Sequence, residues 1–311
     1  MMNDELLALL EAQLKRDGLH VRRNEPMSEH TTYQIGGPAD LFVVAASKDQ
    51  LIFAVKQARA LGIMPFVLGG GANLLVADAG IRGLVIHFRA SQHAFQEKGG
   101  EILLWAEAGA LLKELARESI ARGLEGIEWA VDLPGSIGGA VVSNAGAYGG
   151  YICDCIRKAA VLEPDDTVHE LQTEEMAFCY RGSKFKQQPR YERSIILDVT
   201  LALRSGNVAQ LAKLSSQYTK RRWERQPQDP SCGSVFKRTA RYPAGFLIEQ
   251  CGLKAERRGN AMISPKHANF IVNMGGAKAR DVQALIELAR ERVKAQFDED
   301  LELEVELVGE W

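Results

Sequence analysis

Two glycine-rich segments are the part of this sequence best suited to binding a ligand. The first, Pro65-Phe66-Val67-Leu68-Gly69-Gly70-Gly71-Ala72-Asn73-Leu74-Leu75, is a strand-like stretch ending in three glycines, and the second covers residues 133–139. Consecutive glycines after a strand let backbone N–H groups approach a ligand that a Cβ would keep away. Two such loops predict one phosphate-bearing ligand held from two sides, although two unrelated tight turns would explain the loops alone equally well. Neither loop has a Rossmann or P-loop fingerprint.

Four further clusters combine cations, hydroxyls and carboxylates. They are residues 180–186, residues 233–238, residues 264–269 and the glutamates of residues 301–307. Taken singly, each has a simpler interpretation as a surface ion pair, a turn cap or a solvated sheet face. Together, a phosphate-binding loop, a fixed cation, a hydroxyl and a carboxylate can stabilise an enolate and deliver a proton.

The composition is that of an ordinary globular protein. The 311 residues are 46% hydrophobic and 25% charged, with a net charge of −2. This length predicts two or three domains, and the charge gives no reason to expect a nucleic-acid or membrane partner. The N-terminal residues lack a signal-peptide pattern, and no apolar run approaches the ~18 residues of a membrane span. A cytoplasmic protein is therefore expected.

Cysteine usage also favours the cytoplasm. There are five cysteines, an odd number that argues against a closed disulfide framework. Cys153 and Cys155 form a C-x-C pair, but no second pair or suitably spaced histidine completes a metal site. We therefore expect free, reduced, structural cysteines and no bound metal.

The elements that must position these clusters alternate between strand and helix in the first half of the chain. A capping box at Ser47 and Gln50 predicts a helix that ends at Gly62, and a second helix is expected over 111–122. Strands are predicted over 40–45, 64–68, 83–88 and 101–107. A short N-terminal helix is also expected.

The second half is predicted to be richer in strands. Residues 159–203 are β-rich, with 195–201 the clearest strand, and a helix from about Val208 ends in a basic cluster before Pro227. A strand over 269–273 and a helix with Asp281 as its N-cap follow. Alternating residues 301–307 predict a final strand with leucines and Val305 on one face and glutamates on the other. Domain boundaries are expected near Arg82 and Ser205.

Seven motifs in order resemble one known family. They are residues 33–39 (Tyr-Gln-Ile-Gly-Gly-Pro-Ala), 68–75, 126–149, 180–186 (Tyr-Arg-x-Ser-x-Phe-Lys), 233–237 (Gly-Ser-Val-Phe-Lys), 264–270 (Ser-Pro-Lys-His-Ala-Asn-Phe) and 304–305 (Glu-Val). They are similar to those of the UDP-N-acetylenolpyruvoylglucosamine reductase (MurB) family, and they cover about residues 25–309. One such motif would be weak evidence, but seven in the family's order are specific.

The resemblance implies an α+β fold, the FAD-binding fold of the vanillyl-alcohol-oxidase (PCMH) type. Two α/β FAD-binding subdomains would be residues 20–82, to which the C-terminal strand 301–311 would be added, and residues 83–205. A smaller α+β substrate domain would be residues 206–300. The short stretch between Leu203 and the Gly233-Ser234 motif implies the subgroup with the shorter substrate domain, called type II.

The resemblance also implies an activity. The family's enzyme, UDP-N-acetylmuramate dehydrogenase, is a flavoprotein oxidoreductase that reduces UDP-N-acetylglucosamine enolpyruvate to UDP-N-acetylmuramate in bacterial peptidoglycan synthesis. FAD would be bound non-covalently, with NADPH as co-substrate. A cytoplasmic monomer is implied, with no nucleic-acid, membrane or metal partner.

Site residues follow by matching the family's motifs. The catalytic arginine falls on Arg181, the proton donor on Ser234 and the glutamate on Glu304. The positions implied to bind the cofactor are Leu68, Gly69, Gly70, Gly71, Ala72, Asn73, Leu74, Pro134, Gly135, Ser136, Gly138, Gly139, Ala145 and Gly146. The candidate substrate-binding positions are Tyr180, Lys237, Arg238, Asn269, Arg221 and Arg222.

Four departures from the family pattern concern substrate contacts and loop conformation rather than the reaction. They are Gly182, Thr239, Phe246 and the stretch Arg257-Arg258-Gly259-Asn260. Two alternative functions remain open at this point. The first is another FAD enzyme of the same fold, an oxidase or dehydrogenase of alcohols or hydroxy acids. The second is a non-catalytic protein that binds flavin or a sugar nucleotide.

Overall fold

The computed structural model describes residues 4–189 and 192–311, and the chain divides into two compact units. Unit 1 contains residues up to Arg22, Leu41–Gly70 and Gly83–Lys220, and unit 2 contains Arg23–Asp40, Gly71–Arg82 and Arg221–Trp311. Each unit is therefore assembled from segments far apart in the sequence.

A four-stranded sheet, most of whose residues belong to unit 1, has the strand order β1-β2-β5-β3. The helices α1 (Asp4–Arg16) and α2 (Lys48–Ala60) contact each other next to it. Strands β3 and β5 are parallel, with Leu68 opposite His87. The strands are β1 (Val21–Pro26), β2 (Pro38–Ala45), β3 (Pro65–Leu68) and β5 (Ile81–Phe88). The end of β3 leads directly into the first glycine-rich loop.

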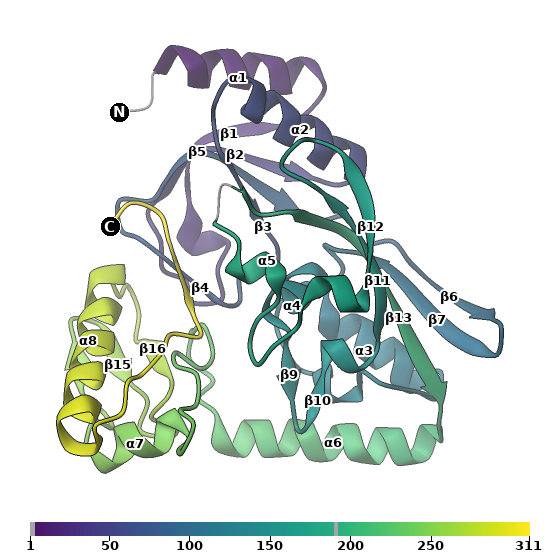
Figure 1. Ribbon diagram of the computed structural model, residues 1–311. Helices are drawn as coiled ribbons and strands as arrows, with labels where there is room; N and C mark the ends of the chain where they lie inside the picture. Colours follow the sequence, from purple (N-terminus) through teal and green to yellow (C-terminus); the bar gives the residue numbers. More distant parts are fainter. Residues whose placement is uncertain (1–3, 190–191) are drawn as a thin grey trace. The chain divides into compact units, whose positions relative to one another are not determined.

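A second sheet in unit 1 is antiparallel and has the order β12-β11-β13-β7-β6, with β8 also paired to β13. Figure 1 shows β11, β13 and β7 as long neighbouring strands. The elements of this part are β6 (His93–Lys98), β7 (Glu101–Glu107), α3 (Leu112–Ala121), β8 (Leu124–Glu125), α4 (Ile137–Ser143), β9 (Gly146–Ala147), β10 (Gly150–Tyr151), β11 (Ile156–Leu162), β12 (Val168–Gln172), α5 (Lys184–Gln187) and β13 (Ile195–Ser205).

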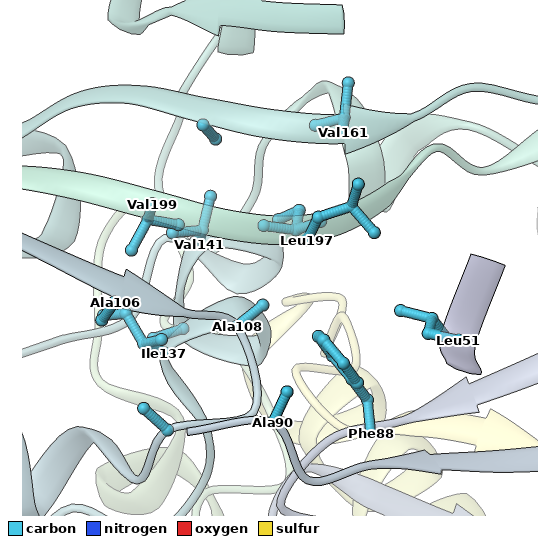
Figure 2. Close-up of a cluster of buried hydrophobic side chains, with 14 of the residues drawn as sticks. Leu51, Phe88, Ala90, Ala106, Ala108, Ile137, Val141, Val161, Leu197 and Val199 are labelled. Carbon is cyan, nitrogen blue, oxygen red and sulfur yellow. The ribbon is translucent and has the colours of Figure 1, made fainter. Parts of the chain in front are cut away.

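The short helix α4 packs on this sheet. Ile137 and Val141, one turn apart on α4, are fully buried beside Val199 of β13 and Ala106 of β7 (Figure 2). Burying each such side chain contributes roughly 1.5–3 kcal/mol relative to leaving it in water. This packing fixes the second glycine-rich loop, because residues 137–139 of that loop form the first turn of α4.

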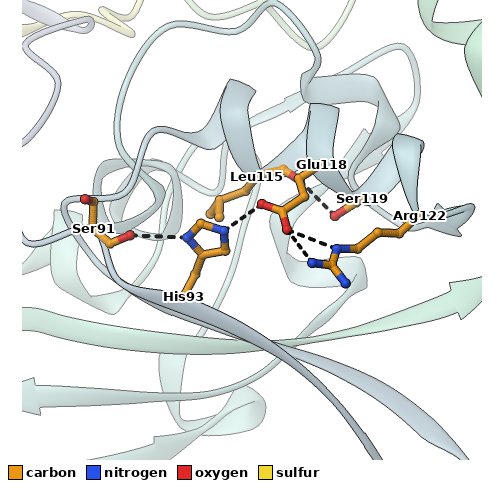
Figure 3. A network of polar contacts seen from close by, with 6 residues as sticks. All are labelled: Ser91, His93, Leu115, Glu118, Ser119 and Arg122. Carbon is orange, nitrogen blue, oxygen red and sulfur yellow. Dashed lines mark hydrogen bonds and ion pairs between the residues drawn. The ribbon is translucent and has the colours of Figure 1, made fainter.

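A polar network joins β6 to α3 at the surface of unit 1 (Figure 3). The Glu118 carboxylate accepts a hydrogen bond from His93 Nε2 at 2.7 Å and two from the Arg122 guanidinium at 2.7 and 3.0 Å. These hydrogen bonds lower the pKa of Glu118 below its ordinary value, and the bond from His93 has the larger effect, ahead of that from Arg122. The network fastens the outer hairpin to the helix beneath it.

Unit 2 has its own buried core. Its elements are β4 (Leu74–Val76), α7 (Ala244–Gln250), β14 (Arg257–Arg258), β15 (Ala261–Ile263), β16 (Ile271–Asn273), α8 (Ala279–Phe297) and β17 (Glu306–Val308). The order β14-β15-β16 makes one small sheet, and β17 runs parallel to β4. The division between the units falls within α6 (Val208–Arg225), between Lys220 and Arg221.

Most of the predicted helices form as expected. Ser47 is the N-cap of α2 and its hydroxyl accepts a hydrogen bond from Gln50 N at 3.2 Å, while Gly62 follows the helix with a φ of 69°. Gly123, with a φ of 71°, follows α3. These are local signals, and the structure confirms them.

The predicted N-cap of α8 is wrong. The helix begins at Ala279 with Lys278 as its N-cap, and Asp281 instead accepts a hydrogen bond from Lys278 N at 3.0 Å. The earlier start is stabilised by Asp78, whose carboxylate accepts from Ala279 N at 2.8 Å and Arg280 N at 3.1 Å. Because Asp78 lies some two hundred residues away in the chain, sequence spacing gave no sign of this cap.

The predicted strand over 301–307 is also largely wrong. Only residues 306–308 form a strand. Before it, the N–H groups of Glu304 and Val305 both point to the carbonyl of Val235, at 2.8 and 3.3 Å. Two successive N–H groups facing one acceptor break the alternation that a regular strand requires. Leu301 and Val305 are buried, but Leu303 and Leu307 are only half-buried.

Within the described ranges 4–189 and 192–311, no helix combines the length and apolar character needed to cross a membrane.

Candidate active site

The two glycine-rich loops touch each other in unit 1. A Cβ added at Gly70 would lie 2.5 Å from Cα of Gly135, and one at Gly69 would lie 2.3 Å from Oγ of Ser136. At Gly70 the atoms in the way belong to the backbone of the other loop, so a side chain there would require the backbone to move, whereas at Gly69 the Ser136 side chain would have to move. Glycine is therefore required at Gly70 by the contact itself. The two loops therefore meet, as the binding of one ligand from two sides would require, and the ligand itself stays a prediction.

The second loop is fixed by the chain around it. Ser136 is the N-cap of α4, and its hydroxyl accepts a hydrogen bond from Gly139 N at 3.3 Å. Gly138 N donates to Ala108 O at 2.9 Å, and Ile137 N donates to Ala110 O at 2.8 Å. These bonds tie the loop to the residues that follow β7. Within this loop, Pro134 and Gly139 are exposed.

The rest of the first loop belongs to unit 2. Gly71 has a φ of +62°, and a Cβ there would lie 2.1 Å from His30 O. Asn73 Nδ2 donates to Glu304 O at 3.0 Å, and Asn73 O accepts from Glu306 N at the same distance. Ala72 and Leu74, on either side of Asn73, are half-buried. The loop predicted to bind the cofactor is thus bonded directly to the backbone of the predicted catalytic glutamate.

Ser234 and Glu304 lie on neighbouring segments of unit 2. Val235 O accepts from Glu304 N at 2.8 Å, and Lys237 N donates to Glu302 O at 2.8 Å. Both Ser234 and Glu304 are half-buried. The chain therefore brings together two backbone segments, about seventy positions apart, one of which carries the Ser234 hydroxyl and the other the Glu304 carboxylate.

Asn269 holds the Ser234 segment in place from the other side. Its side chain accepts from Phe236 N at 3.0 Å and donates to Phe236 O at 2.8 Å, and Val235 N donates to its backbone carbonyl at 2.9 Å. A buried amide with both groups bonded to one backbone unit fixes that unit's conformation. These bonds give Asn269 a structural role, and its substrate contact stays a prediction.

Two titratable groups in unit 2 are buried and hold their protons. Burial, with a smaller contribution from the charge of Glu304, raises the pKa of the Cys232 thiol to about 12. Burial, together with Cys232, also raises the pKa of Tyr33 well above its ordinary value. Cys232 therefore stays a thiol at neutral pH and offers no thiolate nucleophile. Ser234 and Glu304 stay the residues of unit 2 for which acid–base work is predicted.

Arg181 is positioned in unit 1 by a tight turn. Cys179 N donates to Gly182 O at 3.0 Å, and Gly182 N donates to Cys179 O at 3.2 Å, closing the turn around Tyr180 and Arg181. The Arg181 guanidinium donates to Gly146 O at 2.9 Å and lies 5.8 Å from the centre of the Tyr180 ring. The predicted catalytic cation is thus bonded to the predicted cofactor-binding position Gly146.

The other cations predicted to bind the substrate lie in different surroundings. The Lys237 ammonium is ion-paired with the Glu302 carboxylate, and Arg238 is exposed. Arg221 and Arg222 lie in the last turns of α6. Nearby, Lys266 Nζ donates to Trp223 O at 2.5 Å, a contact with the C-terminal end of this helix that the sequence did not predict.

Sequence reasoning also missed Asn144, which is 3% exposed and ends α4 in the left-handed conformation. Its side chain bonds to the turn that carries Arg181. The available signal was that asparagine tolerates the left-handed conformation at the end of a helix. Nothing in the spacing of residues indicated that Asn144 would bond to Cys179.

Two further features lie apart from the predicted residues. Glu25, Glu29 and His30 could offer metal-ligand atoms within 4.8 Å of one another, but His30 Nε2 is hydrogen-bonded to Glu25 Oε1 at 2.8 Å. The predicted absence of a metal stays a prediction. A cavity of about 640 Å³ in unit 1 is lined by side chains that include Trp129, Arg157 and Tyr218, and by none of the predicted site residues.

Comparison with known proteins identifies the family. Residues 39–172 match the model of an FAD binding domain, and residues 226–308 match that of the C-terminal domain of UDP-N-acetylenolpyruvoylglucosamine reductase. A UDP-N-acetylenolpyruvoylglucosamine reductase of Caldanaerobacter subterraneus is 41% identical over 310 residues, covering 99% of this chain and 100% of that protein. One from Alkaliphilus oremlandii is 41% identical over 92% of this chain and 93% of that protein. This chain belongs to the UDP-N-acetylenolpyruvoylglucosamine reductase family.

A solved structure agrees with this assignment. The crystal structure of UDP-N-acetylenolpyruvylglucosamine reductase (MurB) from Thermus caldophilus is 34% identical and has a TM-score of 0.78, covering 93% of this chain and 99% of that one. Membership in the reductase family confirms the resemblance, and with it the expected oxidoreductase class. The FAD-binding match and the mixed helices and strands confirm the expected fold class and the FAD cofactor.

Proposed function

We propose that this protein reduces UDP-N-acetylglucosamine enolpyruvate to UDP-N-acetylmuramate, using NADPH and bound FAD, in bacterial peptidoglycan synthesis. The observation that carries this proposal is the 41% identity to a reductase of that name over 99% of the chain. The step would take place in the cytoplasm of a bacterium and would support cell shape and cell division. We further propose that the protein acts as a monomer with no nucleic-acid or membrane partner.

The residues present fit a bound FAD. The contact between Gly70 and Gly135 leaves both loops without side chains where they meet, which suits a pyrophosphate bound by backbone N–H groups. The cofactor positions proposed are those predicted from the sequence, from Leu68 to Leu74, from Pro134 to Gly139 and at Ala145 and Gly146. When bound, FAD would carry a hydride from NADPH to the terminal carbon of the enolpyruvyl group.

The proposed catalytic residues have complementary roles. The Arg181 guanidinium stabilises the negative charge that develops on the substrate carboxylate and its adjacent carbon. Glu304 shares a proton with that intermediate or orients the arginine, and Ser234 delivers a proton to the carbon. The hydrogen bond from Arg181 to Gly146 and the pairing of the Ser234 and Glu304 segments support these roles.

The finer assignments stay predictions. Tyr180, Lys237, Arg238, Asn269, Arg221 and Arg222 are proposed to contact the substrate. The proposed division of labour assigns FAD binding to residues 20–82 with 301–311 and to residues 83–205, and substrate binding to residues 206–300.

The decisive experiment uses the purified protein and its visible flavin absorbance. We expect NADPH to bleach the absorbance in the absence of oxygen, and UDP-N-acetylglucosamine enolpyruvate to restore it. Rapid recovery with oxygen alone, and none with the sugar nucleotide, would instead indicate an oxidase of the same fold. A protein that binds flavin but is not reduced by NADPH would indicate a binding function.

A further inference from the structure

The turn that carries Arg181 is conformationally strained. Arg181 has a φ of 56°, in the left-handed region that residues with a side chain rarely adopt. Such a conformation persists only where the surrounding structure determines it. The bonds between Cys179 and Gly182 close the turn but do not fix where it lies. Its position must come from contacts with the rest of unit 1.

Asn144 supplies one of these contacts. It is 3% exposed, and its Nδ2 donates to Cys179 O at 2.9 Å, the carbonyl at the start of the turn. Its Oδ1 accepts from Cys153 N at 3.2 Å. Both ends of the buried amide are therefore engaged, so the side chain has one orientation and its bond to the turn is fixed in direction.

A second contact lies on the other side of Arg181. The hydroxyl of Ser183, which is fully buried, donates to Val142 O at 2.7 Å. Val142 and Asn144 both lie at the C-terminal end of α4, whose first residues form the second glycine-rich loop. The two contacts fasten the Arg181 turn to the far end of the same short helix.

The head group of Arg181 is bonded to the same stretch of chain. Its Nη1 donates to the carbonyl of Gly146, two residues beyond Asn144. Loss of the Asn144 side chain would remove the hydrogen bond to Cys179 O, at the start of the turn. The Gly146 carbonyl that accepts from Arg181 would still be present. The turn would then lose its contact at Cys179 while keeping that of Ser183, and the position of the guanidinium would be less well defined.

We propose that Asn144 is a positioning residue for Arg181, acting through the backbone carbonyl of Cys179. The proposal rests on the function proposed for Arg181 above. A guanidinium that stabilises a developing charge loses much of its effect if it is displaced by about 1 Å. Asn144 therefore acts on the step in which substrate is reduced and leaves the step in which NADPH is oxidised largely unaffected.

Two variants isolate this contact. Asn144→Gly removes both side-chain bonds, and glycine adopts the φ of 44° at this position without strain. Asn144→Asp keeps an acceptor for Cys153 N but removes the donor to Cys179 O, so it tests the contact if the glycine variant does not fold. Ser119→Ala is the matched control, since it removes one buried hydrogen bond, to Leu115 O, on helix α3.

The two half-reactions are measured separately by stopped-flow absorbance of the flavin. In Asn144→Gly and Asn144→Asp, we expect reoxidation by UDP-N-acetylglucosamine enolpyruvate to slow by about tenfold or more, with reduction by NADPH changed by less than about twofold. In Ser119→Ala, neither rate should change by more than about twofold. Equal slowing of both half-reactions in the Asn144 variants would overturn the proposal.

A double-mutant cycle tests whether the effect passes through Arg181. Introduced into Arg181→Ala, the Asn144→Gly change should slow reoxidation by less than about twofold, because the group that it positions is already absent. The same tenfold loss in both backgrounds would overturn the proposal. If Arg181→Ala itself reoxidises at the parent rate, the proposed catalytic role fails instead, and the two failures are therefore distinguishable.

Amide hydrogen exchange of the flavin-free protein provides a readout that does not depend on activity. We expect the peptide containing Cys179 and Gly182 to exchange several-fold faster in Asn144→Gly than in the parent protein or in Ser119→Ala. The peptide covering α8 serves as an internal reference and should be unchanged. Unaltered exchange at Cys179 and Gly182 would show that the turn is positioned without Asn144.

Discussion

Ser234 lies on a backbone segment that is bonded on both sides, by Asn269 and by the segment that contains Glu304. A serine hydroxyl is a weak acid in water, so its use as a proton donor requires that its position be fixed. The bonds to Val235 and Phe236 provide this, since they hold the two residues that follow Ser234. A serine on a mobile loop would not meet that requirement.

The first prediction concerns Ser234→Ala. We expect reduction of the flavin by NADPH to be nearly unchanged and reoxidation by substrate to slow by roughly 10²- to 10⁴-fold, the usual contribution of a positioned acid. The measurement is stopped-flow absorbance of each half-reaction. Equal loss in both half-reactions would argue against a proton-donor role.

His267 is a side chain whose titration near neutral pH should affect stability. Its ring packs edge-on against Phe270, with centroids 4.9 Å apart, and its Nδ1 accepts a hydrogen bond from Asn269 N at 3.2 Å. Burial lowers the pKa of His267 below its ordinary value of 6.5; Lys254 also lowers it, and Glu249 partly opposes this. Protonation of Nδ1 would place its N–H opposite the Asn269 N–H and break this hydrogen bond.

The second prediction follows from the sign of that shift. Because the unfolded chain binds the proton more readily than the folded one, the free energy of unfolding should fall as the pH drops below 6.5 towards the lower folded pKa. His267→Asn keeps an acceptor for Asn269 N and should flatten this part of the profile. Urea denaturation at several pH values would measure it, and an unchanged slope in the variant would show that other groups cause the fall.

At the scale of elements, the glycine-rich loops work as a pair. The φ of Gly70 is not positive, so its requirement for glycine comes from the close approach of the backbone of Gly135 and Ser136. The third prediction is that Gly70→Ala pushes the loops apart and weakens FAD binding strongly, as measured by titrating flavin-free protein with FAD.

A matched control separates steric contact from backbone strain. Gly18 has a φ of +82° but nothing within 4 Å of an added Cβ. Gly18→Ala should cost roughly 1–2 kcal/mol of stability through its left-handed backbone and leave FAD affinity unchanged. Similar affinities in the two variants would show that the contact between the loops is unimportant for the cofactor.

Elements with local signals were predictable from the sequence, and elements set by distant partners were not. Helix α2 has its cap and its terminating glycine within its own residues, so both ends were predicted correctly. Helix α8 begins where Asp78 caps it, and the C-terminal segment departs from a strand where it meets Val235. The spacing of residues within either segment contains no information about these partners.

At the scale of the whole molecule, each unit draws on several parts of the chain. In unit 2, the buried side chains of Tyr33, Ile35 and Leu75 belong to one core with residues from the last third of the sequence, such as Val235 and Val305. These early residues therefore lack a folding partner until the C-terminal segment has been made. Unit 2 cannot be obtained by cutting the chain at one point.

The fourth prediction tests this interdependence. A fragment ending at Lys220 should expose Tyr33, Ile35 and Leu75, which are at most 2% exposed in the full chain. We expect it to bind the dye ANS and to associate, as seen by fluorescence and size-exclusion chromatography, because apolar patches without a partner promote both. A monomeric fragment without dye binding would show that these residues find another partner.

The sequence by itself determined the family, the FAD-binding fold class and most helices, because these depend on motifs and on neighbours within a few positions. Only the tertiary structure decided that Gly70 meets Gly135, that Asn73 bonds Glu304 and that Asn144 holds the turn of Arg181. Asn73 and Glu304 are 231 positions apart. Such contacts depend on how the whole core packs, and local patterns in a single sequence do not specify which distant residue will complete a hydrogen bond.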